Sequence, residues 1–486
     1  MATSGKLGLL QQLRAWLFAL VFLPATIVLV LLVMSSGVFP VGKNTSPLPQ
    51  LPVEIMDGVT FAPVQTLHGW AQFSPFYPVR RYRVPPKGCS ITQVNILKRH
   101  GARFPTLHSG ERIKSAVDKL KSAKSYIRED LQFLKDYTYD LGFDDLVALG
   151  ALQSYTAGQL AFTRYSHLLS GDATLPPFVR STSSSRVIDS AHNWTSGFSF
   201  ASQHRFNPVL SVIMSKDSAN NTLAHSGCPL AGDGDEKSDA WVNIYATPIA
   251  KRFNSLALDM NSNLTAADVV DLISLCPFDS VAKQEPSQFC NIFEPEDFTN
   301  FEWGMNLDKY YGTGYGQPVG GRVEGVGYVN ELIARLTNTP VRDNTQTNRT
   351  LDSDPATFPL DRSIFADFSH DNQMVAIYSA LGLLNEKHEV LDETRVNPET
   401  EWDTSEVVSF SAEMVVERLS CAWDPPVAGY KPTEYVRIMI NDALQPMSFC
   451  GADENGLCKL SKFVESQSYA RNDGDGDFEK CFLTQT

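Results

Sequence analysis

The sequence predicts an α/β fold with a site built at the carboxyl ends of neighbouring strands. Three segments predict it, at residues 91–105, 175–186 and 363–382. In each of them an apolar, strand-like run ends in charged or polar residues and leads toward a helix-forming stretch. An open α/β sheet uses such strand-to-helix junctions to assemble one site from distant parts of a chain. Each junction is therefore expected to contribute polar side chains to a common edge of the sheet.

The first junction carries two arginines and a histidine. Residues 91–97 are rich in β-branched side chains and contain no glycine or proline, which predicts a strand. Arg99 and Arg103 offer planar sets of donors suited to phosphate oxygens, and His100 can act as a neutral nitrogen nucleophile in acid or neutral solution. Gly101 allows the backbone to turn closely around a bound anion. This stretch predicts a phosphate site with a nucleophile inside it.

The other two junctions supply partners for that site. Arg180 ends a short apolar run and precedes hydroxyl residues that can cap a helix, and Arg186 lies close enough beyond it to brace the loop. The strand-like residues 363–369 lead into His370 and Asp371, which are followed by apolar residues at helical spacing. Backbone N–H groups at the start of a helix favour an anion, so His370 and Asp371 are expected to face one.

Length and composition narrow the class of protein. With 486 residues, 43% of them hydrophobic and 20% charged, the chain can bury a large core and form two lobes or domains. The net charge of −14 argues against nucleic acid as a partner. No cysteine pair has metal-ligand spacing, the other histidines show no partner pattern for a metal, and no Gly-Lys-Ser/Thr phosphate loop occurs. A small anionic substrate would need a local basic pocket.

The N-terminal region predicts export. Residues 15–34 are apolar and uncharged and follow Lys6 and Arg14, which predicts a signal anchor or a cleaved signal peptide within residues 1–35. Residues 36–64 hold several prolines with serine and threonine and predict an extended stalk. The chain is thus expected to be secreted or, if the segment is uncleaved, held by a single-pass type II anchor on the outer side of the membrane.

Sequons and cysteines support export independently. Sequons for N-glycosylation occur at Asn44, Asn193, Asn220, Asn263 and Asn348. An even number of cysteines, eight, predicts four disulfide bonds in an exported chain. The short separations favour two of these bonds, Cys276 with Cys290 and Cys450 with Cys458, and leave the remaining pairing open.

Together these segments resemble one family, the histidine acid phosphatases, and within it the secreted fungal phytases. The resemblance extends over residues 65–486. Residues 99–106 resemble the family signature, and residues 178–181 resemble the segment with its second phosphate-binding arginine. Residues 369–372 resemble its proton-donor motif. Two further segments are similar to the fungal branch, residues 325–336 and 356–360.

The resemblance implies a specific architecture and disulfide pattern. It implies a large α/β domain with a central mixed sheet flanked by helices. A smaller, mainly helical domain would be inserted between the residue 99 and residue 370 motifs. The implied disulfide pairs are Cys89–Cys421, Cys228–Cys481, Cys276–Cys290 and Cys450–Cys458. The monomer is the favoured state.

The resemblance also implies a phosphohistidine mechanism without a cofactor. His100 would attack phosphorus and Asp371 would protonate the leaving alkoxide, with its pKa raised by the bound phosphate dianion. The residues implied to hold the nonbridging oxygens are Arg99, Arg103, Arg180 and His370. The arginines would lower the pKa of His100 and keep it unprotonated in acid. Activity in the acid range is the expected result.

The substrate is expected to be a small phosphomonoester. Phytases often carry several lysines around the pocket, whereas here Ser109, Glu111 and Asp308 stand at such positions. The pocket is expected to include Thr106, Arg112 and Lys309. Inositol hexakisphosphate is the first choice of substrate, and a broad-specificity acid phosphatase is the alternative. A catalytically degenerate, membrane-tethered glycoprotein is a third, weaker possibility.

Overall fold

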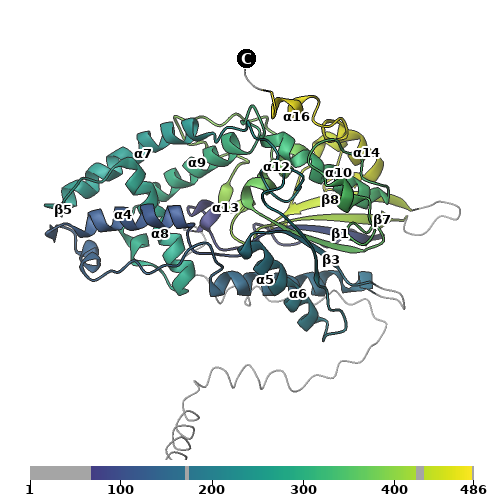
Figure 1. Cartoon of the computed structure of the whole chain (residues 1–486), viewed down its shortest axis with the longest axis horizontal. Coiled ribbons are helices and arrows are strands. Elements are labelled where there is room, and N and C mark those ends of the chain that lie inside the picture. The colour runs from purple at the N-terminus through teal and green to yellow at the C-terminus, as the bar shows by residue number, and fades with distance from the viewer. Residues whose placement is uncertain (1–66, 170–174, 423–431, 484–486) are drawn as a thin grey trace, which may run out of the picture. The chain divides into compact units, whose positions relative to one another are not determined.

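The computed structural model describes residues 67–169, 175–422 and 432–483 (Figure 1). The predicted signal segment, the stalk and the sequon at Asn44 lie outside the described residues. Within these three ranges, no helix combines the length and the hydropathy needed to cross a bilayer.

A mixed eight-stranded sheet lies at the centre, as predicted, in the order β10-β8-β7-β1-β6-β3-β4, with β9 added on β8. β1 runs parallel to β6, β6 to β3, and β3 to β4, while β7, β8, β9 and β10 pair antiparallel with their neighbours. Their bounds are β1 (Cys89–Arg99), β3 (Phe178–Thr182), β4 (Leu210–Met214), β6 (Ile364–Ser369), β7 (Glu413–Cys421), β8 (Thr433–Ile440), β9 (Ala443–Leu444) and β10 (Cys458–Lys459).

Apolar side chains are buried on both faces of the sheet. Ile96 and Phe368 belong to a core that includes residues of α5 (Ala148–Tyr165) and α6 (Ser185–Ala201). Leu97 and Phe365 belong to the opposite core, which includes residues of α10 (Val326–Thr337) and α12 (Asp371–Leu381). Figure 1 shows these two pairs of helices on opposite sides of the sheet. Successive strand residues point to opposite faces, so strands covered on both sides bury consecutive residues, as residues 93–99 of β1 and all of β6 do.

A group of long helices lies beside the sheet (Figure 1). They are α4 (Leu107–Lys121), α7 (Asp235–Leu256), α8 (Ala266–Lys283) and α9 (Pro295–Gly312), and all come between the residue 99 and residue 370 motifs. Their organisation as a separate inserted domain stays a prediction. The shorter elements are η1 (Ala71–Phe73), β2 (Ser125–Tyr126), η2 (Glu129–Lys135), η3 (Ser166–Leu169), β5 (Ala257–Leu258), η4 (Gln288–Ile292), η5 (Gly321–Gly325), α11 (Arg349–Asp352), α13 (Thr404–Val407), η6 (Ser448–Cys450), α14 (Leu460–Ser466), α15 (Ser468–Arg471) and α16 (Asp477–Lys480).

Disulfide bonds connect distant parts of this fold. Cys89 and Cys421 face each other across β1 and β7, where they are also paired in the sheet register. The remaining bonds join Cys228 with Cys481, Cys276 with Cys290, and Cys450 with Cys458. All four pairs are those that the family resemblance implies. Four of the predicted sequons lie at positions that are at least partly exposed, Asn193, Asn220, Asn263 and Asn348.

Candidate active site

The first and third predicted junctions meet at one edge of the sheet. The parallel register places Arg99 beside Ser369 at the carboxyl ends of β1 and β6, and the backbone N–H of His100 donates to the carbonyl of Ser369. His370 is the N-cap of α12, and Asp371 is its first residue. Two segments about 270 residues apart in sequence thus place a histidine pair and an acid at the same site, as the pattern predicts.

His100 is buried and held in one tautomer. Its imidazole is 1% exposed, and its Nδ1 lies 2.9 Å from the carbonyl oxygen of Gly101. A carbonyl only accepts hydrogen bonds, so Nδ1 carries the hydrogen and Nε2 keeps its lone pair. Burial, and then the charges of Arg99 and Arg103, hold the pKa of His100 well below its usual value. The side chain is therefore neutral in acid and has a nitrogen ready to attack.

Three arginines, one buried and two partly buried, lie near this histidine. Arg99 is fully buried and lies over the ring of Phe410, 4.8 Å from its centroid. Burial and the neighbouring arginines lower the pKa of Arg103 to about 9. Arg186, in the first turn of α6, adds a third charge, because it lowers the pKa of His100 and of Arg103. The Nε atoms of all three arginines are buried without a hydrogen-bond partner among the described residues, so each has a donor left for a bound anion.

Arg180 does not belong to this group, which corrects the prediction for it. The strand β3 continues beyond Arg180 to Thr182, so the residue lies inside the sheet instead of at a strand end. Its guanidinium is 1% exposed and bonded to two carboxylates, Glu331 at 2.6 Å and Asp367 at 2.8 Å. Arg180 has no free charge to offer a phosphate. Arg186, which the sequence only suggested as a brace for the loop, lies near enough to His100 and Arg103 to lower the pKa of both.

The pKa values of His370 and Asp371 are both lowered, which leaves His370 neutral and Asp371 ionised in mild acid. Burial, and then the charge of Arg186, lower the pKa of His370 to about 3, and its Nε2 lies 3.1 Å from the Ser184 hydroxyl. Burial by itself would raise the pKa of Asp371, but Arg99 and Lys309 lower it well below the usual value. The Oδ2 atom of Asp371 is 3.1 Å from Arg99 Nη2 and 3.4 Å from Lys309 Nζ. Asp371 is therefore ionised until an anion competes for these cations.

The loop that carries His100 is fixed by the helices beneath it. The backbone N–H of Gly101 donates to Ser190 Oγ at 3.0 Å, and that of Ala102 donates to Gln153 Oε1 at 2.9 Å. A Cβ atom on Gly101 would lie only 2.1 Å from the carbonyl oxygen of Gly150 in α5. Glycine is thus needed here because the protein's own backbone passes so closely, and the turn around a bound anion stays a prediction.

The predicted pocket residues have different environments. Thr106 is the N-cap of α4, and its hydroxyl accepts from the backbone N–H of Ser109. Arg112 is half exposed, with Nη2 at 3.3 Å from Asp271. Lys309 is buried and donates to Asn372 Oδ1 at 2.6 Å, next to Asp371. Only Lys309 therefore contacts the acid of the site directly.

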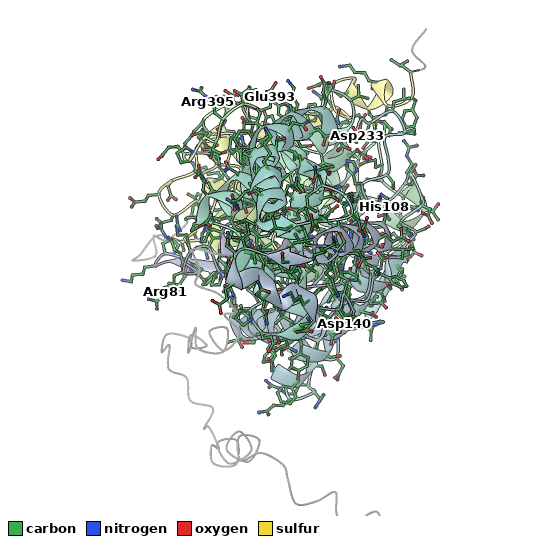
Figure 2. The ribbon with its side chains drawn as sticks, turned by 90° about the vertical axis from the view of Figure 1, so that its left-hand side faces the viewer. Arg81, His108, Asp140, Asp233, Glu393 and Arg395 are labelled. Atoms are coloured by element: carbon green, nitrogen blue, oxygen red, sulfur yellow. A yellow bond between two sulfur atoms is a disulfide. The ribbon has the colours of Figure 1, made fainter. Side chains whose placement is uncertain are left out.

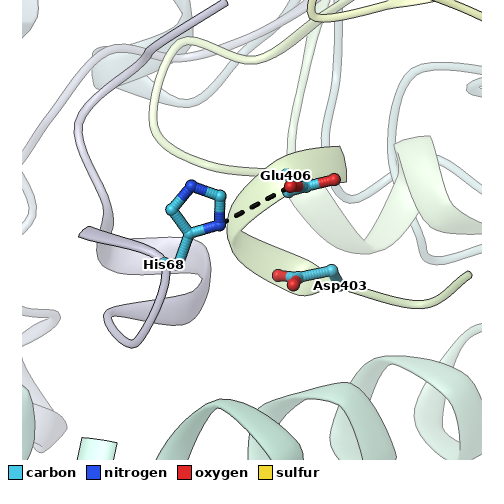
Figure 3. A group of neighbouring side chains, drawn as sticks. All are labelled: His68, Asp403 and Glu406. Carbon is cyan, nitrogen blue, oxygen red and sulfur yellow. Dashed lines mark ion pairs between the residues drawn. The ribbon is translucent and has the colours of Figure 1, made fainter. Parts of the chain in front are cut away.

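The burial of these charges separates the site from the ordinary surface. Arg81, Asp140 and Arg395 are exposed and labelled at the edges of the molecule in Figure 2, as charged residues usually are. A possible group of metal ligands, His68, Asp403 and Glu406, includes none of the predicted site residues; their ligand atoms lie within 4.8 Å of one another (Figure 3). The positive charge around His100 comes from guanidinium and ammonium groups, which can stabilise a phosphoryl group as it is transferred.

A family comparison agrees with this geometry. A model of the histidine phosphatase superfamily, branch 2, matches residues 90–441. The chain belongs to this superfamily, and it is a phosphomonoester hydrolase of the histidine acid phosphatase type. It is similar to Phytase A of Neurospora crassa, with 37% identity over 476 residues, covering 86% of this chain and 92% of that protein. Phytase A of Arthroderma benhamiae is 38% identical over 427 residues, covering 84% and 91%.

Solved structures share the fold. The phytase from D. castellii superposes with a TM-score of 0.68 at 22% identity, covering 84% of this chain and 85% of that one. The multiple inositol polyphosphate phosphatase of Bifidobacterium longum, in complex with inositol hexasulfate, gives a TM-score of 0.59 at 16% identity, covering 84% and 98%. At these identities the likeness concerns the fold of the chain.

Proposed function

We propose that this protein is a phytase, which releases phosphate from inositol hexakisphosphate through a phosphohistidine at His100. The observation that carries the proposal is the hydrogen bond from His100 Nδ1 to the Gly101 carbonyl, which leaves Nε2 as the attacking atom. The relatives named Phytase A support the choice of substrate, because they match this chain over most of their length.

In the first step, Nε2 of His100 attacks phosphorus and the bond from phosphorus to the inositol oxygen breaks. The departing alkoxide takes the proton of Asp371, so inositol with one phosphate fewer leaves as a neutral alcohol at that position. Arg99, Arg103 and Arg186, together with His370, hold the nonbridging oxygens and offset the charge that they carry. Arg186 replaces Arg180 in this set.

Protonation of Asp371 depends on the substrate. Without an anion, Arg99 and Lys309 keep the pKa of this carboxyl low. A bound phosphate dianion draws the same cations toward itself and adds negative charge nearby, so both effects raise that pKa. His370, whose pKa is about 3 in the unliganded site, gains a proton more readily for the same reason. Asp371 therefore becomes protonated when the substrate binds, and it can then act as the acid.

In the second step, a water molecule attacks the phosphohistidine opposite the imidazole. Asp371, now ionised, accepts a proton from this water, and the P–N bond breaks to release inorganic phosphate and regenerate neutral His100. The low pKa of His100 favours this step, because a weakly basic imidazole is a better leaving group.

A broad-specificity acid phosphatase is the second candidate. This candidate is supported by the pairing of the two pocket cations. Arg112 is paired with Asp271, and Lys309 contacts Asn372 and Asp371. Neither is free to bind an additional phosphate of a polyanionic substrate without giving up a partner. The third possibility, a degenerate protein without activity, is disfavoured by the complete set of nucleophile, acid and phosphate-binding groups.

The test is an assay of phosphate release at mildly acid pH in the presence of a chelator. We expect kcat/KM for inositol hexakisphosphate to exceed that for a simple aryl phosphate, and His100→Ala to abolish both activities. Equal or better turnover of the aryl ester would support the broad acid phosphatase. Full activity of His100→Ala on both substrates would contradict the mechanism itself.

We also propose that the protein enters the secretory pathway and is secreted or held outside the cell, as a monomer. Four disulfide bonds support this, because such bonds persist in oxidising compartments. The test is to express the full chain in a eukaryotic secretory host, treat it with an N-glycosidase and sequence its N-terminus. A glycosylated product in the medium is expected. A product that stays inside the cell without glycans would contradict the proposal.

A further inference from the structure

A buried carboxyl on α9, that of Glu302, lies between two backbone segments of the site. Its side chain accepts from the backbone N–H of Ala71 at 2.6 Å through Oε2 and from that of Ser405 at 2.8 Å through Oε1. The residue is 6% exposed. A carboxyl placed in such an interior is costly unless its oxygens are hydrogen-bonded, and here both oxygens accept from backbone groups.

Both segments bind the guanidinium of Arg99. The carbonyl of Gln72, next to Ala71, and the carbonyl of Val408, three residues after Ser405, accept from the same atom, Arg99 Nη1. The other terminal nitrogen, Nη2, donates to Asp371. The direction of the Arg99 side chain is therefore set largely by two carbonyls on separate segments, and it depends on how those segments are spaced.

The two segments are also joined to each other. The Ser405 hydroxyl donates to the carbonyl of His68 at 3.0 Å, and His68 Nδ1 lies 3.5 Å from Glu406 Oε1 (Figure 3). Ala71 has a φ of 51°, in the left-handed region that non-glycine residues seldom adopt. Such a conformation persists only where surrounding contacts hold it, and the bond from its N–H to Glu302 is one of them.

We propose that Glu302 is a positioning residue of the active site. From α9 it fixes the spacing between residues 71–72 and residues 405–408, and through their carbonyls it aims the Arg99 guanidinium at the phosphate. The proposal rests on the phosphate-binding role of Arg99 in the proposed function. Glu302 itself does not touch the reacting atoms.

The electrostatic surroundings of Glu302 are acidic. Burial, and then the nearby Asp403, raise the pKa of Glu302 well above its usual value. Burial and Asp403 also raise the pKa of Glu406, while His68 and Arg80 oppose that increase. In acid, Glu302 carries a proton and still presents an acceptor lone pair on each oxygen. Loss of that proton would place a second negative charge beside Asp403 and strain the arrangement.

The test compares Glu302→Gln with Asp297→Asn. Asp297 is an equally buried acid on the same helix, 5% exposed, where it caps the helix and pairs with Arg252. The readouts are the dissociation constant for inorganic phosphate by calorimetry, KM and kcat for an aryl phosphate, and the melting temperature, all with chelator. We expect Glu302→Gln to weaken phosphate binding and raise KM roughly tenfold, because the amide loses one acceptor. Asp297→Asn is expected to lower only the melting temperature.

A double-mutant cycle assigns the effect to Arg99. If Glu302 acts through Arg99, Glu302→Gln should weaken phosphate binding no further in an Arg99→Ala background. Should Glu302→Gln fail to fold, Glu302→Asp keeps both acceptors but withdraws them by one methylene, and it should weaken phosphate binding in the same direction. Unchanged phosphate binding in the variant that folds, or equal and additive losses with Arg99→Ala, would overturn the proposal.

These outcomes are separable from a failure of the proposed function. Phosphate binding by calorimetry requires no turnover, so it reports on Arg99 even if His100 is not the nucleophile. A His100→Ala variant that stays fully active refutes the mechanism and leaves the positioning of Arg99 to be judged by the phosphate measurements alone.

Discussion

Two groups of arginines contribute positive charge to the interior, and they differ in how fully carboxylates pair with them. Asp367 accepts from both Arg180 and Arg335, and Glu331 accepts from Arg180, each at hydrogen-bond distance. Around His100 the guanidinium groups outnumber the acids, and within the described part of the chain Asp371 is the one carboxylate that contacts Arg99. Burial of charge therefore marks a functional site only where opposite charge is lacking.

The pKa values follow the same division. Burial alone would lower the pKa of Arg180, but Asp367 and Glu331 raise it well above the usual value. For Arg103, burial and the other arginines act together and lower the pKa to about 9. The group of Arg180 and Arg335 with Asp367 and Glu331, here called the neutralised group, is stable by itself. The group around His100 is stabilised by adding an anion.

The largest expected effect is on the neutralised group. Arg180→Ala leaves Glu331 and Asp367 without one of their partners in the interior, so we expect a loss of about 3–5 kcal/mol in the free energy of unfolding. Denaturant unfolding followed by circular dichroism measures it. The folded fraction should still bind inorganic phosphate normally, and a specific loss of phosphate binding at unchanged stability would show that Arg180 belongs to the site after all.

The converse variant is Arg186→Ala. This change removes a phosphate-binding charge without orphaning a buried carboxylate, because its partner Asp144 is 40% exposed. We expect kcat/KM to fall by about 10²–10³-fold, as when one transition-state donor is removed, with little change in stability. Steady-state kinetics alongside a melting curve provide the measurement. An activity loss no larger than that of Arg180→Ala would remove the distinction between the two groups.

The difference between these arginines also explains what the sequence can predict. The strands at β1 and β6 and their junctions, which place His100 and Asp371 close together, follow from local apolar runs and the residues that end them. The position of Arg180 depends on two facts that no local pattern contains. Strand β3 continues two residues further, and Glu331 arrives from a helix some 150 residues away in sequence. Arg186 was visible only as a basic residue near a helix start.

A smaller effect concerns the pH dependence of stability. It comes from the carboxyl of Asp352, which lies near Glu331, Arg180 and Arg335. Its two oxygens are buried without a partner among the described residues, and burial, then Glu331, raises its pKa to about 8. The folded state thus holds this proton more tightly than the unfolded chain, whose pKa is about 3.9. The stabilisation is fully present below about pH 4 and is lost as the pH rises toward 8.

Asp352→Asn should remove that part of the pH dependence. We expect the wild type to lose on the order of 2 kcal/mol more than the variant in its free energy of unfolding between pH 4.5 and pH 7.5. Urea unfolding at several pH values measures the difference, with the exposed Asp361→Asn as the control. Parallel stability curves for Asp352→Asn and the wild type would mean that this carboxyl titrates normally.

The smallest expected effect concerns an exposed arginine, Arg112. It tests whether a paired surface charge is also withheld from the substrate. Arg112 is 48% exposed and held by Asp271 at 3.3 Å, so its charge is partly neutralised and strongly screened. Asp271→Asn should free that charge and raise kcat/KM for inositol hexakisphosphate about two- to threefold at low ionic strength, without changing kcat/KM for an aryl phosphate. The gain should disappear in 0.5 M salt and in the Arg112→Ala, Asp271→Asn double variant. Only a polyanionic substrate has further phosphates that can contact Arg112. Equal gains on both substrates would therefore contradict the prediction and place the effect at the reacting phosphate.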